Sequence, residues 1–90
     1  MIFIKENNEI VECKHIKKDK IEYSIKIDEI NRKAYFVYNY VLVNENNVIL
    51  LQCDNESERD YYLNLIIDYI KKNQIIDFNK IFNENLKKRS

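Results

Sequence analysis

The sequence predicts an α+β fold in which an antiparallel sheet of about five strands, arranged as a meander, packs against a long C-terminal helix with a short terminal helix after it. Three observations predict it. Apolar and polar residues alternate over much of residues 1–53, as they do in strands. Asn clusters interrupt this alternation, and in a chain without Gly or Pro, Asn is well suited to turns. From residue 56 the apolar spacing becomes helical.

We therefore expect a single domain over residues 1–90, with the strands within 1–53 and helices at about 56–73 and 77–87. The first two strands form a hairpin, because alternation over residues 1–5 stops at the polar segment 6–9 and resumes over 10–16. A third strand has one buried and one solvent-facing side, since polar residues separate its apolar ones: Ile21, Tyr23, Ile25 and Ile27.

The fourth strand, residues 34–43, is apolar on both faces and is interrupted only by Asn39. Strands of this kind are usually central and covered on both sides, which predicts that further protein lies over this one. The Asn-rich segment 44–47 then provides a turn, and residues 48–53 form the fifth strand.

The long helix begins after Asp54 or Asn55, either of which can cap it, and acidic residues in its first turn suit the positive end of the helix dipole. We expect it to end near Asn73 and to carry an unusually wide apolar surface. Asp77 caps the second helix, which precedes a basic tail at residues 87–89 and whose apolar face comprises Phe78, Ile81, Phe82 and Leu86.

Composition excludes several classes of function. The absence of Gly removes phosphate loops, dinucleotide fingerprints and nucleophile elbows, so we expect no enzyme and no cofactor. The 15 basic and 15 acidic residues balance, which favours neither nucleic acid as a direct partner nor an anionic membrane. No apolar run is long enough to span a membrane and no secretory signal is visible, so we expect a cytoplasmic protein.

Cysteine and histidine chemistry is weakly indicated. Cys13 and His15 share a strand face, with Cys53 and Asp54 as conceivable further metal ligands. Structural zinc requires four ligands, usually in paired knuckles, and side chains two apart on a strand are about 6.5–7 Å apart, too far for a thiolate and its base. We therefore predict no metal site and no catalytic residue, and we expect both cysteines to be reduced thiols.

Tyrosine is the most suggestive residue type, with seven copies in the chain. Tyr combines rigid apolar area with a hydroxyl group and is enriched at protein interfaces. Two interpretations stay open, a role in the core and a partner-binding surface on the fourth strand and the long helix. The candidate partner-binding residues are Tyr35, Tyr38, Tyr40, Tyr61, Tyr62 and Tyr69.

In layout and composition alone, the chain resembles the short proteins of phages and mobile elements in low-GC bacteria. Our leading hypothesis is a small non-enzymatic binding protein of this origin that acts in the host cytoplasm. It would bind and inhibit a host protein or protein complex, such as a CRISPR effector or another defence component. One alternative is a dimer that sequesters a signalling nucleotide between tyrosines of two subunits. Another is a homodimeric structural or regulatory module whose excess apolar surface is its dimer interface.

Overall fold

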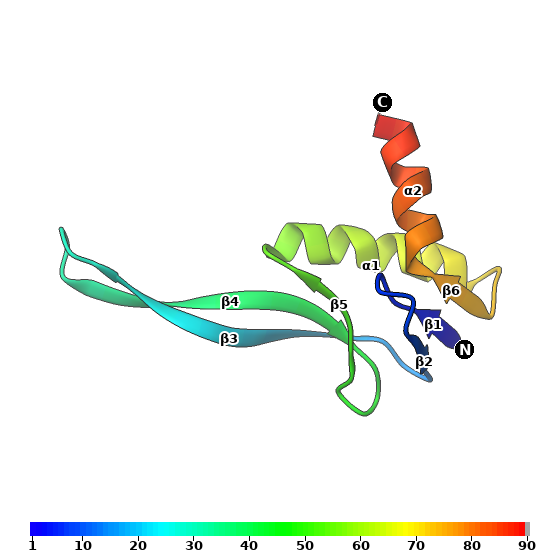
Figure 1. Ribbon diagram of the computed structural model, residues 1–90, viewed down its shortest axis with the longest axis horizontal. Helices are drawn as coiled ribbons and strands as arrows, with labels where there is room; N and C mark the ends of the chain where they lie inside the picture. The colour runs from blue at the N-terminus through cyan, green and yellow to red at the C-terminus, as the bar shows by residue number, and fades with distance from the viewer. Residues whose placement is uncertain (90) are drawn as a thin grey trace.

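The structure is a computed structural model that describes the backbone of residues 1–89 and the side chains of residues 1–84. The described chain forms two helices and two small sheets (Figure 1), which confirms the α+β class. In order, its elements are β1 (Ile2–Ile4), β2 (Ile10–Glu12), β3 (Lys17–Asp28), β4 (Lys33–Val43), β5 (Ile49–Cys53), α1 (Glu56–Ile70), β6 (Ile75–Asp77) and α2 (Phe78–Arg89).

The single five-stranded sheet was a wrong prediction. The strands form two three-stranded sheets, one in the order β2-β1-β6 and the other in the order β3-β4-β5. The expected hairpin of β1 and β2 and the antiparallel run β3-β4-β5 are both present. Strand β6 was not expected. It pairs with β1 in parallel, because the chain after α1 returns beside the N-terminus and the Ile2 amide donates to the Gln74 carbonyl at 2.9 Å.

A polar junction separates the two sheets. After β2 the backbone amides of Lys14 and His15 donate to the Glu45 carboxylate, the shortest distance being 2.7 Å. The side-chain amide of Asn44, which is buried, donates to the Glu12 carbonyl at 3.1 Å. These bonds satisfy the Glu12 carbonyl and the Lys14 and His15 amides with side chains instead of a neighbouring strand, so β2 does not continue into the second sheet.

Helix α1 begins as expected, with the Asn55 side chain accepting a hydrogen bond from the Glu58 amide at 2.8 Å. It ends at Ile70, three residues before the predicted end, and contacts β4, β5 and β6, so it joins the two sheets. The Asp77 carboxylate accepts from the Asn79 amide at 3.1 Å, as a helix cap does. Leu86 and the basic tail at 87–89 lie outside the described side chains.

The hydrophobic core lies between α1, the start of α2 and the inner faces of the sheets. Phe3 on β1 and Ile76 on β6 are fully buried, as is Ile66 on α1. Tyr62 packs edge-on against Phe78, their ring centroids 5.3 Å apart. We call this compact part of the molecule the body.

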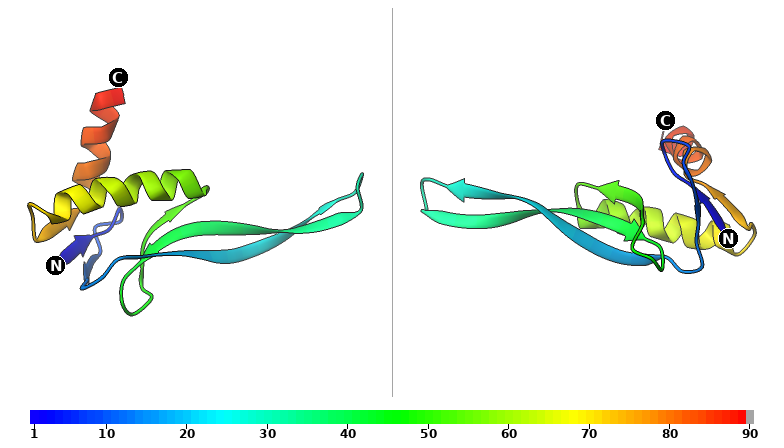
Figure 2. Two further views of the ribbon diagram at one scale, coloured as in Figure 1. Left: turned by 180° about the vertical axis from the view of Figure 1, so that it is seen from behind. Right: turned by 60° about the horizontal axis from the view of Figure 1, so that its bottom comes forward.

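Beyond the body, β3 and β4 continue as a two-stranded hairpin (Figures 1 and 2). Strand β5 pairs with β4 only at Tyr40–Val43, so the hairpin outside these residues has no third strand within the described chain. We call residues 21–39 the arm. The arm accounts for the elongated shape of the molecule, whose principal extents are 50 × 36 × 21 Å.

Candidate functional site

The arm carries the exposed apolar surface that is the candidate site. Strands β3 and β4 pair in antiparallel register from Lys17 opposite Val43 to Asp28 opposite Lys33. The register shifts once, between Glu22 and Ser24, which leaves Tyr23 as an extra residue in a β-bulge. A bulge changes which residues of the strand point to which side of the hairpin, and this one determines the chemistry of the arm.

Before the bulge, the β4 residues Tyr38 and Tyr40 share their side with charged partners, because Glu22 lies opposite Tyr38 and Lys20 opposite Tyr40. After the bulge, Ile25 lies opposite Phe36 and Ile27 opposite Ala34. The bulge thus moves the two isoleucines to the same side as Phe36. We call Ile25, Ile27 and Phe36 the arm face.

The arm face is open to solvent. The exposed fractions are 57% for Ile25, 72% for Ile27 and 54% for Phe36. The prediction that β3 has a buried apolar side was therefore wrong, because no other element of the described chain covers this part of the hairpin. At roughly 200 Å² for a large apolar residue, the three side chains present roughly 350 Å² to water.

The opposite side of the arm is mostly polar. After the bulge it carries Ser24, Lys26 and Asp28 from β3, opposite Val37, Tyr35 and Lys33 of β4. At the tip, the Asp28 carboxylate accepts hydrogen bonds from the backbone and side chain of Asn31. These bonds lower the pKa of Asp28 below its ordinary value, and the bond to the Asn31 side chain has the largest effect. The arm is therefore amphipathic, with an ordered turn at its tip.

The base of the arm is fixed to the body by a buried cation. The Arg59 side chain, on α1, is 8% exposed and donates to the Asp19 carbonyl of β3 at 2.9 Å. Its guanidinium also lies 5.3 Å from the centre of the Tyr40 ring and forms an ion pair with the neighbouring Asp60. These contacts satisfy the buried charge and join α1 to both strands of the hairpin.

The six predicted tyrosines do not form one surface. Tyr35 is 52% exposed and points to the polar side of the arm, whereas Tyr38 is half-buried, with its ring 6.4 Å from Phe36 and the Lys20 ammonium 4.6 Å away. Tyr40 belongs to the Arg59 contact. The other three lie on the body: Tyr61 at its surface, Tyr62 in the core, and Tyr69 donating a hydrogen bond to Glu84, which raises the pKa of Tyr69.

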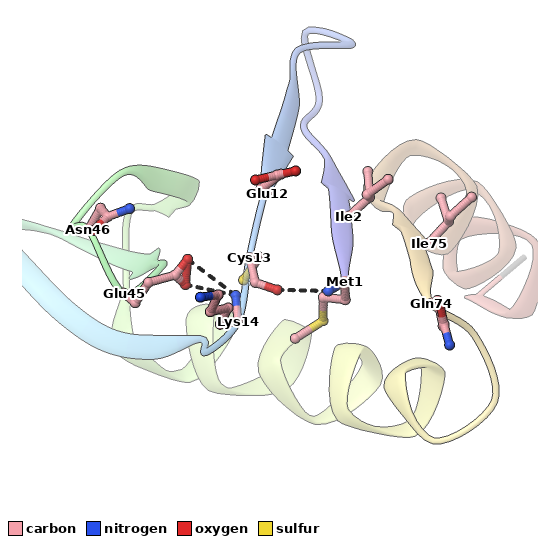
Figure 3. A pocket seen from close by; sticks show the side chains of 9 residues that line it. All are labelled: Met1, Ile2, Glu12, Cys13, Lys14, Glu45, Asn46, Gln74 and Ile75. Atoms are coloured by element: carbon pink, nitrogen blue, oxygen red, sulfur yellow. Dashed lines mark hydrogen bonds between the residues drawn. The ribbon is translucent and has the colours of Figure 1, made fainter.

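A pocket of about 720 Å³ lies where the N-terminus meets the junction between the sheets (Figure 3). The Met1 ammonium group donates to the Cys13 carbonyl at 3.0 Å, and Glu45 is turned towards the Lys14 backbone. The Cys13 thiol donates to the His15 carbonyl at 3.2 Å, and burial raises its pKa, so the thiolate is disfavoured. The Met1 ammonium group, the Cys13 thiol and the Glu45 carboxylate of this pocket therefore already have partners within the fold.

Both cysteines are free and buried, and burial together with the nearby Glu58 and Asp54 charges raises the pKa of Cys53 to about 11. Among the described side chains, no group of three or more His, Cys, Asp or Glu residues is arranged to hold a metal ion. None of the helices, over their described residues, is long and apolar enough to cross a membrane.

Comparisons with protein-family models, with curated proteins and with solved structures found no match to this chain. The evidence that the arm face is a candidate site therefore comes from its geometry alone. Sequence reasoning missed it because the alternation of Ile21, Tyr23, Ile25 and Ile27 was interpreted as burial. The length of the alternating segment could have indicated this exposure, because a strand of 12 residues is longer than one helix of 15 residues can cover.

Proposed function

We propose that this protein is a non-enzymatic binding protein that attaches to a partner protein through the arm face and blocks it. The observation that carries the proposal is the exposure of Ile25, Ile27 and Phe36 on one side of a projecting hairpin. Side chains of this type are normally buried, and exposed apolar patches with a polar surround mark sites of protein interaction. The partner that we propose is a protein of the cell that hosts a phage or mobile element.

The surroundings of the arm face support a protein surface as the partner. Lys20 and Glu22 border the apolar side chains towards the base, and Lys26 and Asp28 lie on the reverse side. An apolar centre with a mixed-charge border is the usual composition of a protein interface. A strand hairpin also presents these side chains at fixed spacing, so little conformational entropy is lost when they are covered.

Adjacent positions on opposite sides of the arm provide a matched test. Ile25→Asp places a charge in the proposed interface, whereas Lys26→Asp places the same side chain one residue away on the polar side. Photocrosslinking from position 25 in host cells should identify the partner, and position 26 should not crosslink it. With the purified partner, Ile25→Asp should weaken binding by about tenfold or more, because an unpaired charge would be buried.

Inhibition is tested by measuring the activity of the purified partner that crosslinking identifies. The wild-type chain and Lys26→Asp should both reduce that activity, and Ile25→Asp should leave it intact. Equal binding by the two variants would show that the arm face is not the binding surface. Binding without any loss of the partner's activity would retain the interaction and reject the inhibitory role.

A further inference from the structure

The two long edges of the arm differ in their capacity to accept another strand. The free edge of β3 carries the bulge at Tyr23 and several charged residues, which are features that prevent strands from pairing edge to edge. The free edge of β4 runs over residues 33–39, up to Tyr40 where pairing with β5 begins. It contains no bulge, and Lys33 is its only charged residue.

We propose that this free edge of β4 pairs antiparallel with the same edge of a second copy of the chain. The aromatic and β-branched residues of the segment favour a strand, and nothing in it blocks backbone pairing. An isolated two-stranded hairpin is marginally stable in water, whereas three or more strands support one another. Pairing would place each arm within a four-stranded sheet in the order β3-β4-β4-β3.

The limits of the edge determine the register. One end is set by β5 at Tyr40 and the other by the turn before Lys33, so seven residues are free to pair. The register that uses all seven places Phe36 on the two-fold axis, opposite Phe36 of the other copy. Antiparallel pairing over seven residues forms about six to eight backbone hydrogen bonds.

Charges agree with this register. Lys33 of one copy lies opposite Asn39 of the other, so the cation meets a neutral amide and not a second cation. The next residue, Arg32, lies just outside the paired segment and faces the end of β5 in the second copy, where the acidic Asp54 follows Cys53. The arrangement therefore brings opposite charges together at each end of the paired segment.

Symmetry also aligns the apolar surfaces. A two-fold axis perpendicular to a sheet leaves like sides of both copies on the same side, so the two arm faces become continuous. Their combined apolar area is roughly 700 Å², close to the roughly 800 Å² that each partner contributes to a standard interface. This last step rests on the proposed function, but the pairing of the edges does not.

Two cysteine substitutions distinguish edge pairing from other contacts. In Phe36→Cys the two new thiols face each other across the axis, at a separation that permits a disulfide. In Ile25→Cys, at the same side of the arm and of similar exposure, the new thiols are three strand spacings apart, about 14 Å. With oxidised glutathione, Phe36→Cys should form the covalent dimer about tenfold faster than Ile25→Cys, or more. The wild-type chain, whose Cys13 and Cys53 are buried, gives the background rate of dimer formation.

Light scattering of the wild-type chain should give twice the chain mass of 11.0 kDa. Amide hydrogen exchange over residues 33–39 should slow as the concentration rises, whereas exchange at the β3 edge should not. Equal disulfide formation by the two variants would indicate stacked faces and overturn edge pairing. A protein that stays monomeric at all concentrations, with unchanged amide exchange, would also overturn edge pairing. The proposed function would still stand in that case if Ile25→Asp loses partner binding and Lys26→Asp keeps it.

Discussion

The body and the arm contain the same kinds of apolar residue and bury them very differently. Phe3 in the body is fully buried, whereas Phe36 in the arm is 54% exposed, although both lie on strands. The difference is the layer above the strand: α1 and α2 cover the inner face of β1, and no described element covers the arm face. Apolar alternation therefore indicates which side of a strand prefers burial, and a second layer has to provide it.

The largest expected effect tests this comparison directly. Phe3→Ala should lower the free energy of unfolding by about 3–5 kcal/mol, because it leaves a cavity in a closed core. The same substitution at Phe36 should change it by less than about 1 kcal/mol in dilute solution, since water already reaches the ring. Urea unfolding of both variants measures the two values. Equal losses would mean that the arm face is covered within a single chain.

The next effect concerns the joint between the two regions. Arg59→Ala should destabilise the protein by about 2–3 kcal/mol, because it removes a charged hydrogen bond to the Asp19 carbonyl and the contact with Tyr40. Lys18→Ala is the matched control. The Lys18 ammonium pairs with Asp60 at 3.6 Å but is half exposed, so its loss should cost about 0–1 kcal/mol.

Spectra separate a loosened joint from general unfolding. In Arg59→Ala the amide resonances of β3 and β4 near the base should shift more than those of β1 and β6. A uniform shift throughout the protein, or a cost no greater than that of Lys18→Ala, would show that Arg59 does not hold the arm to the body.

Alkaline pH should weaken the body through Cys53, the last residue of β5. Burial raises its pKa from 9.0 to about 11, so the folded state retains the proton that the unfolded chain loses first. Stability from this group is therefore fully present below about pH 9 and is lost as the pH rises towards about 11. The urea midpoint measured across this range should fall less steeply in Cys53→Ala. Parallel slopes in the two proteins would contradict the assignment, because other groups titrate equally in both.

Sequence patterns predicted the parts of the fold that depend on neighbouring residues. The Asn55 cap, the hairpin of β1 and β2 and the turns at Asn8 and Asn47 are all local. The division into two sheets was not predictable in this way, since it depends on Glu45 binding the backbone of residues 14–15, about 30 positions away.

The candidate site was likewise predictable only where it depends on neighbouring residues. Tyr38 lies beside the arm face, yet Ile25 and Ile27 were placed on the buried side of a strand. Which side they occupy depends on the bulge at Tyr23, and a bulge has no reliable signature in a sequence without Gly. The abundance of tyrosine left a core role and a partner-binding surface both open, and Ile25 and Ile27 form most of the exposed area of the arm face.

The smallest expected effect compares the turns of the two regions. Asn8 and Asn47 occupy the left-handed region in the body, at φ 67° and 62°, and Asn tolerates this conformation. Arg32, at the tip of the arm, has φ 52° and lacks that advantage. Arg32→Asn should therefore stabilise the hairpin by about 0.5–1 kcal/mol. Lys33→Asn removes the same charge one residue later, within β4, and should be neutral or destabilising, because Asn is a poor strand residue. Amide exchange over residues 24–37 at low micromolar concentration measures the change in the arm alone, and a gain common to both variants would assign it to charge and not to backbone conformation.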